Sequence, residues 1–174
     1  LTPRTSALKL SDPAPAGAAL DAMLGAGVRA PDHGRLRPWK FLLVRGPARE
    51  KLGAVLAASL KTRDPAATEE LLARERGKAL RAPLIVVVAA CVRPTAKVPE
   101  VEQIVSAGAA AQNILVAAHA LGFGGFWRTG PAAYDPEVKR ALGLRAEDAI
   151  VGLLYIGTVA APAAPKTPDA AGIT

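Results

Sequence analysis

The sequence of 174 residues is 51% hydrophobic and carries a formal net charge of +7 at pH 7. This hydrophobic content excludes a disordered chain, and the length predicts a single domain over residues 1–174. The single cysteine excludes an internal disulfide framework and a cysteine-rich zinc site.

The 22 lysines and arginines are scattered along the chain without interleaved aromatic residues, so the positive charge does not favour a nucleic-acid partner. No stretch approaches the ~18 uncharged apolar residues that a membrane-spanning helix needs, which predicts no membrane partner. There is no signal-peptide pattern either, and we predict a cytoplasmic location.

Apolar spacing and helix-breaking residues predict an alternation of helices and strands. A first helix begins near residue 16 and ends before residue 29. Further helices are predicted over 48–63, 67–80, 100–121 and 135–142, and strands over 39–44, 83–92 and 150–159. The second of these strands is a continuous β-branched run, which predicts that both of its faces are covered.

Residues 29–39, called the basic loop below, join the first helix to the first strand. Three arginines and one histidine crowd into this loop around Pro31 and Pro38, which stiffen the backbone. Pro31 disfavours the helical conformation at Ala30, so the helix should end there. Asp32 can then turn the chain, and Gly34 can take a conformation that other residues resist. The loop could hold an anion or could be a solvated connector, and by itself it favours neither.

The predicted helix 100–121 is apolar nearly all round. Such a helix is normally buried at the centre of a fold or packed against another subunit. His119, near its end, has no second histidine or carboxylate three or four residues away, so we predict no metal site.

Residues 121–130 read Leu-Gly-Phe-Gly-Gly-Phe-Trp-Arg-Thr-Gly and follow a helix, whereas the dinucleotide fingerprint follows a strand. Gly122 is predicted to end that helix through a left-handed cap. Gly124 and Gly125 would let another backbone or a flat ligand approach closely. Residues 127–129 then offer an apolar wall, a cation and a hydroxyl.

Several of these blocks together resemble the nitroreductase family of flavoproteins, and in particular its single-domain YdjA-like branch. The resemblance covers nearly the whole chain. It rests on Arg4-Thr5-Ser6, Arg29-Ala30-Pro31-Asp32-His33 with Arg37-Pro38-Trp39, Lys97-Val98-Pro99 with Glu102-Gln103, Ser106-Ala107-Gly108, residues 121–130 and residues 151–158.

The resemblance implies an α+β fold in which a mostly antiparallel central sheet is flanked by helices. It also implies a homodimer formed through long central helices, with FMN at the subunit interface. The implied FMN-binding residues are Arg4, Thr5, Ser6, Arg29, His33, Arg37, Trp127, Arg128 and Thr129, with His33 reaching across the dimer. Ala117 falls where the branch receives the nicotinamide.

The implied function is that of an FMN-dependent oxidoreductase with a ping-pong mechanism. NADH or NADPH would pass hydride to flavin N5, and a nitroaromatic, quinone or similar small acceptor would take it. The flavin then carries the chemistry, so no catalytic side chain is predicted. The alternative is a non-catalytic flavin- or nucleotide-binding module.

The sequence departs from the family pattern at Thr5, at Arg37 and in the tail, which lacks the aromatic residues often seen there; the departures at Thr5 and in the tail leave that alternative open. Thr5 stands where a second arginine is common, which removes one charge from the phosphate site. Arg37 stands where glutamine is common. A cation there would lie near the flavin pyrimidine and would stabilise the negative charge that develops on reduction.

Overall fold

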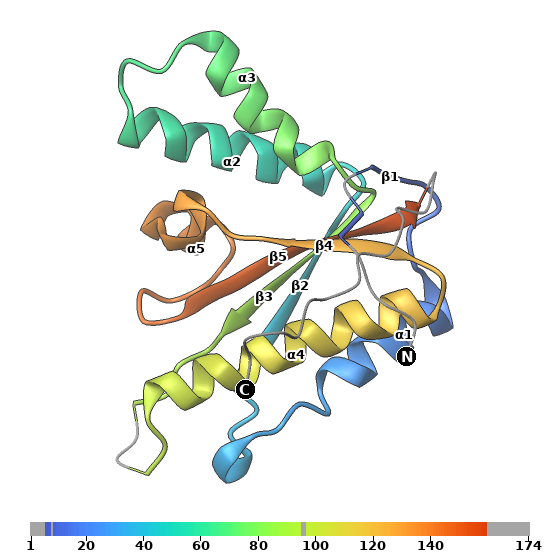
Figure 1. The fold of residues 1–174 in the computed structure, drawn as a ribbon. Helices are drawn as coiled ribbons and strands as arrows, with labels where there is room; N and C mark the ends of the chain where they lie inside the picture. The colour runs from blue at the N-terminus through green and yellow to red at the C-terminus, as the bar shows by residue number, and fades with distance from the viewer. Residues whose placement is uncertain (1–5, 8, 95–96, 160–174) are drawn as a thin grey trace, which may run out of the picture.

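The computed structural model describes residues 6–7, 9–94 and 97–159. Helices cover both faces of one sheet (Figure 1). The α-helices are α1 (Gly17–Gly27), α2 (Ala48–Arg63), α3 (Glu69–Gly77), α4 (Glu100–Ala120) and α5 (Pro136–Ala141). The strands are β1 (Leu10–Ser11), β2 (Trp39–Arg45), β3 (Leu84–Ala90), β4 (Gly124–Arg128) and β5 (Ala149–Val159). Short 3₁₀ turns are η1 (His33–Arg35), η2 (Lys78–Leu80) and η3 (Pro131–Tyr134).

Every strand pairing in the described sheet is antiparallel. The longest strand, β5, pairs with β1, β3 and β4, and β2 completes the sheet beside β3. This confirms the α+β class with a mostly antiparallel sheet. Dimerisation and the single-domain assignment stay predictions.

The alternating side chains of β3 enter two separate cores, because successive residues of a strand point to opposite faces. Ile85 and Val87 pack in the core that includes Leu56 of α2. Val86 packs in the core that includes Ile114 of α4. Figure 1 shows α2 and α3 on one side of the sheet and α1 and α4 on the other. The prediction that both faces of this strand are covered is therefore confirmed.

The predicted helices and strands are all present, with ends shifted by a few residues at most. The third predicted helix begins at residue 69 because the Thr68 hydroxyl accepts the Leu71 N–H and caps it. Two strands were not predicted. The first, β1, has only two residues, and the glycines at the start of β4 conceal its strand character. None of the described helices is long and apolar enough to cross a membrane.

The glycines of β4 are explained by close packing within the chain. A β-carbon on Gly124 would lie 2.2 Å from Val159 Cγ2, and one on Gly125 would lie 2.9 Å from Leu115 Cδ2 and 3.2 Å from the Tyr155 carbonyl oxygen. The expected close approach of another backbone is found at Gly125, whereas at Gly124 the atoms that approach belong to side chains. Gly122, at φ +83, ends α4 as predicted.

Helix α4 is apolar nearly all round but only partly buried. It packs against α1 and the sheet through residues that include Ala111 and Ile114. Its outer face carries Val101, Val105 and Val116, which are 63%, 64% and 50% exposed. Both alternatives predicted for this helix therefore apply, because one face is central to the fold and the described residues leave another face uncovered.

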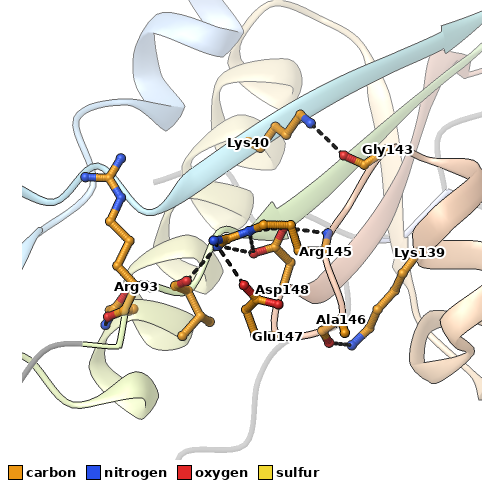
Figure 2. A network of polar contacts seen from close by, with 10 residues as sticks. Lys40, Arg93, Lys139, Gly143, Arg145, Ala146, Glu147 and Asp148 are labelled. Atoms are coloured by element: carbon orange, nitrogen blue, oxygen red, sulfur yellow. Dashed lines mark hydrogen bonds and ion pairs between the residues drawn. The ribbon is translucent and has the colours of Figure 1, made fainter.

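A polar network ties the turn before β5 to the ends of β2 and β3 (Figure 2). Arg145 Nη2 donates to Asp148 Oδ1 and to the Val92 carbonyl, each at 2.7 Å, and the Arg145 N–H donates to Asp148 Oδ2 at 2.9 Å. Lys40 Nζ donates to the Gly143 carbonyl at 3.2 Å. The network therefore holds the start of β2, which follows the basic loop, and the chain just after the end of β3.

The Asp148 carboxylate is ionised in this network. Burial is the largest influence on its pKa and by itself would raise it. Hydrogen bonds from the Arg145 side chain and backbone, together with the guanidinium charge, outweigh that effect and hold the pKa below the ordinary value of 3.8.

We expect Asp148→Asn to be less stable than the wild type at pH 7, because the amide loses both the charge and one acceptor oxygen. A carboxyl whose folded-state pKa is depressed stabilises the fold above its unfolded pKa and loses that contribution as the pH falls. The difference between variant and wild type should thus be constant down to about pH 5 and shrink below 3.8. Urea unfolding at pH 7, 5 and 3 measures it, and a difference that stays unchanged at pH 3 would contradict the assignment.

Candidate functional site

The basic loop is fastened to α4 by two side-chain contacts. The Ser106 hydroxyl donates to the Pro31 carbonyl at 2.5 Å, and His33 Nδ1 lies 2.5 Å from Glu102 Oε2. Helix α1 ends at Gly27, before Pro31, as predicted. The first half of α4 thus sets the position of a loop that lies far from it in sequence.

Within the loop, the Asp32 carboxylate organises the backbone. Its Oδ1 accepts the Leu36 N–H at 3.1 Å and its Oδ2 accepts the Arg37 N–H at 2.7 Å. Gly34 has φ +72, which confirms the conformation predicted for it. Arg35 and Arg37 have φ +53 and +48, in the left-handed region that a β-carbon disfavours. The loop is therefore rigid because several constraints act on it together.

A concave pocket of about 340 Å³ lies between the basic loop and α4. Its wall is largely apolar, with His33 and Glu102 as polar members. The lining residues are Pro31, Asp32, His33, Val101, Glu102, Val105, Ser106 and Ala109. Two of them, Val101 and Val105, belong to the exposed face of α4, so anything that packs on that face also covers the pocket.

The predicted site residues of β4 lie on opposite faces of the sheet. The Trp127 side chain packs against the core beside α4, and its Nε1–H donates to the Val151 carbonyl at 3.1 Å. Arg128 lies on the other face, with its guanidinium 5.6 Å from the centroid of the Phe126 ring. This split follows from strand alternation, which a loop assignment for these residues could not foresee.

Arg128 and Thr129 share a second, smaller pocket of about 60 Å³ with Tyr155. The Phe126 and Tyr155 rings are stacked with centroids 4.7 Å apart. Burial raises the pKa of the Tyr155 phenol, and Arg81 and Arg128 only partly oppose this, so the phenol is protonated at neutral pH. Gly130, at φ +109, also lines this pocket, and a β-carbon on it would meet nothing within 4 Å.

The remaining predicted residues are distributed as follows. Ser6 and Arg29 are exposed, and Ala117 is partly buried against the core beside α4. Arg4 and Thr5 lie outside the described residues. Within one chain the structure therefore brings His33 to the larger pocket and Arg128 with Thr129 to the smaller one, and these two groups line separate cavities.

Sequence reasoning missed three residues that build this region. Asp32 was expected only to turn the chain and Ser106 was quoted only as part of a motif, yet both hold the basic loop. Gln103 is 2% exposed, and its amide bonds both the N–H and the carbonyl of Arg93 at 2.8 Å. The available signal was a polar residue facing inward on an otherwise apolar helix, because a buried amide nearly always has partners.

Comparison with known proteins agrees with this architecture. A family model described as "Nitroreductase family" matches residues 2–158. The Escherichia coli K12 protein named "Putative NAD(P)H nitroreductase YdjA" is 43% identical over 155 residues, which cover 89% of this chain and 84% of that protein.

Solved structures give the same result. The crystal structure of a nitroreductase-like family protein from Bacillus cereus matches with TM-score 0.80 and 29% identity, over 95% of this chain and 87% of that one. A Desulfovibrio desulfuricans protein crystallised in complex with FMN matches with TM-score 0.73 and 26% identity, over 98% and 90%. On the strength of the family match and the 43% identity to YdjA, this chain belongs to the nitroreductase family.

Proposed function

We propose that this protein is an FMN-dependent oxidoreductase that transfers hydride from NADH or NADPH to a nitroaromatic, quinone or similar small acceptor in a ping-pong cycle. Family membership supports this, as do the NAD(P)H nitroreductase name of the YdjA relative and the FMN complex of the Desulfovibrio protein. In this chain, the proposal rests on the basic loop, whose backbone is fixed and whose arginines are exposed.

Arg29 and Arg37 of the basic loop are available for an anionic ligand. Both are exposed, and no carboxylate oxygen of the described residues lies within 4.0 Å of their guanidinium groups. A solvated connector would not need its backbone held by both Asp32 and α4. A rigid loop that presents unpaired cations fits a ligand with a dianionic phosphate better than it fits a connector.

The donor set also fits the rest of FMN. Hydroxyl and guanidinium donors at Ser6, Arg128 and Thr129 suit a ribityl chain and a phosphate, and the open side of Gly130 leaves room for a flat group. When bound, FMN supplies the hydride-transfer chemistry between NAD(P)H and the acceptor, while the protein supplies binding, orientation and electrostatics. Because FMN supplies this chemistry, no catalytic triad of side chains is required.

We assign the roles of these residues from the family pattern. Arg4, Thr5 and Ser6 would hold the phosphate and ribityl end, and Arg29, His33 and Arg37 would reach the flavin from the basic loop. Arg128 and Thr129, together with Trp127 on the other face of the sheet, would complete the pocket, and Ala117 would contact the nicotinamide.

We further propose that the protein is a homodimer with FMN at the subunit interface. The exposed valines of α4 lie in a stripe on one side of the helix with Gln112 between Val105 and Val116, and Val101 and Val116 are about 22 Å apart along it. Apolar stripes of that length on a helix normally face a partner. A second copy packed on this stripe would cover the larger pocket and bring His33 toward a flavin held mainly by the other subunit. The cytoplasmic location stays a prediction.

FMN titration followed by fluorescence tests the cofactor assignment, because a protein-bound flavin usually has a different emission from the free one. We expect saturable binding of one FMN per chain, with a dimer mass by light scattering. Absence of FMN binding to the purified protein would refute the proposal. A protein that binds FMN but cannot be reduced by NADH or NADPH would instead be the non-catalytic module.

A further inference from the structure

Two non-glycine residues of the basic loop, Arg35 and Arg37, have a strained backbone conformation with positive φ. Arg35 and Arg37 are the only non-glycine residues with positive φ in the part of the chain that the structure describes. Glycine adopts this conformation freely and already does so at Gly34, directly before Arg35. Side chains kept at such positions need a compensating interaction, and strain of this kind gathers at functional sites.

The compensating interaction comes from Asp32. Its two carboxylate oxygens accept the N–H groups of Leu36 and Arg37, at 3.1 and 2.7 Å, and so fix the two peptide groups on either side of Leu36. The Asp32 carbonyl also accepts the Arg35 N–H at 3.3 Å. Ionised acceptors make stronger hydrogen bonds than neutral ones, which suits a carboxylate for opposing backbone strain.

The base of the loop is held independently of Asp32. Ser106 bonds the Pro31 carbonyl, and Glu102 contacts His33, both from α4. On the other side, the Cys91 N–H donates to the Pro38 carbonyl at 2.5 Å. Loss of the Asp32 carboxylate would therefore release residues 34–37 while leaving both ends of the loop attached.

We propose that Asp32 is the positioning residue of the flavin site: by bonding both N–H groups it holds Arg37 in its left-handed conformation and fixes the guanidinium toward the bound cofactor. This rests on the proposed function. Asp32 itself touches no cofactor in this scheme and acts through Arg37, whose cation stabilises the negative charge of the reduced flavin.

The test compares Asp32→Ala, Asp32→Asn, Arg37→Gly and the double variant Asp32→Ala/Arg37→Gly with the wild type, and Arg35→Gly serves as the matched control. Each protein is assayed for FMN affinity, for the midpoint potential of bound FMN and for the rate of tryptic cleavage after Arg35. Glycine at 35 or 37 relieves strain, so neither glycine variant should be less stable than the wild type.

We expect Asp32→Ala and Arg37→Gly each to weaken FMN binding about tenfold, the effect of one lost charge-assisted contact, and to lower the midpoint potential. Asp32→Asn keeps one acceptor and should fall between wild type and alanine. The double variant should match Arg37→Gly, because two residues that act through one contact are not additive. Arg35→Gly should retain the wild-type affinity and potential. Cleavage after Arg35 should be at least about tenfold faster in Asp32→Ala.

The outcomes separate this inference from the proposed function. A wild-type protein that binds no FMN ends both. If the wild type binds FMN but Asp32→Ala keeps its affinity and potential, only the role of Asp32 is refuted. The same holds if the effects of Asp32→Ala and Arg37→Gly add in the double variant, because Asp32 would then act without Arg37. If Asp32→Ala does not fold, Asp32→Asn takes its place, and the double variant Asp32→Asn/Arg37→Gly completes the same double-mutant cycle.

Discussion

A variant with arginine at both Val105 and Val116 should be monomeric and should bind FMN about a hundredfold more weakly than the wild type. Both side chains lie on the exposed stripe of α4, at 64% and 50% exposure, so the substitutions do not disturb the core of the chain. Burying two unpaired guanidinium groups on each side of an apolar interface is strongly unfavourable. A cofactor held between subunits is lost with the dimer.

Light scattering gives the mass of this variant, and FMN titration gives its affinity. The matched control carries arginine at Leu71 and Leu80, which are similarly exposed apolar residues of α3 and η2. That control should remain dimeric and bind FMN normally. A Val105→Arg/Val116→Arg protein that is still a dimer with bound FMN would show that α4 is not the interface.

Gly152→Ala should lower the free energy of unfolding by about 3 kcal/mol, at the upper end of the range for overpacked cores. A β-carbon on Gly152 would lie 2.1 Å from Trp127 Nε1 and within 2.8 Å of two further indole atoms. The indole cannot move away without breaking its hydrogen bond to the Val151 carbonyl. Pairing with β5 fixes the backbone at Trp127, and pairing with Val88 of β3 fixes it at Gly152.

Urea unfolding followed by tryptophan fluorescence measures this change. The control is Gly25→Ala in α1, where a β-carbon meets nothing within 4 Å. Because alanine favours a helix over glycine, that control should gain up to about 1 kcal/mol. A Gly152→Ala protein as stable as the wild type would mean that the indole does not lie over this glycine.

The sequence specified the sheet and helices well wherever the local pattern and the tertiary structure agree. The β-branched run of β3 and the proline and aspartate that bound α2 left little choice. It failed at β4, where Gly124 and Gly125 are required by tertiary packing and lower the local strand signal. Strand propensity cannot reveal a strand whose residues are determined by the atoms that pack against them.

The candidate site was predictable in composition but not in geometry. Two prolines and the positive charge indicated a stiff basic loop, which the structure confirms at Pro31 and Gly34. The left-handed Arg35 and Arg37 were not foreseen, because they depend on where the Asp32 carboxylate points. The separation of Trp127 from Arg128 followed from the missed strand. The larger pocket was not foreseen either, because it depends on how the basic loop lies against α4.

Anaerobic reduction of the FMN-loaded protein tests the central claim most directly. Addition of NADH or NADPH in stoichiometric amount should bleach the visible absorption of the oxidised flavin, and a quinone or nitroaromatic added afterwards should restore it. Free FMN at the same concentration serves as the control. An FMN-loaded protein that keeps its colour with both NADH and NADPH would contradict the account.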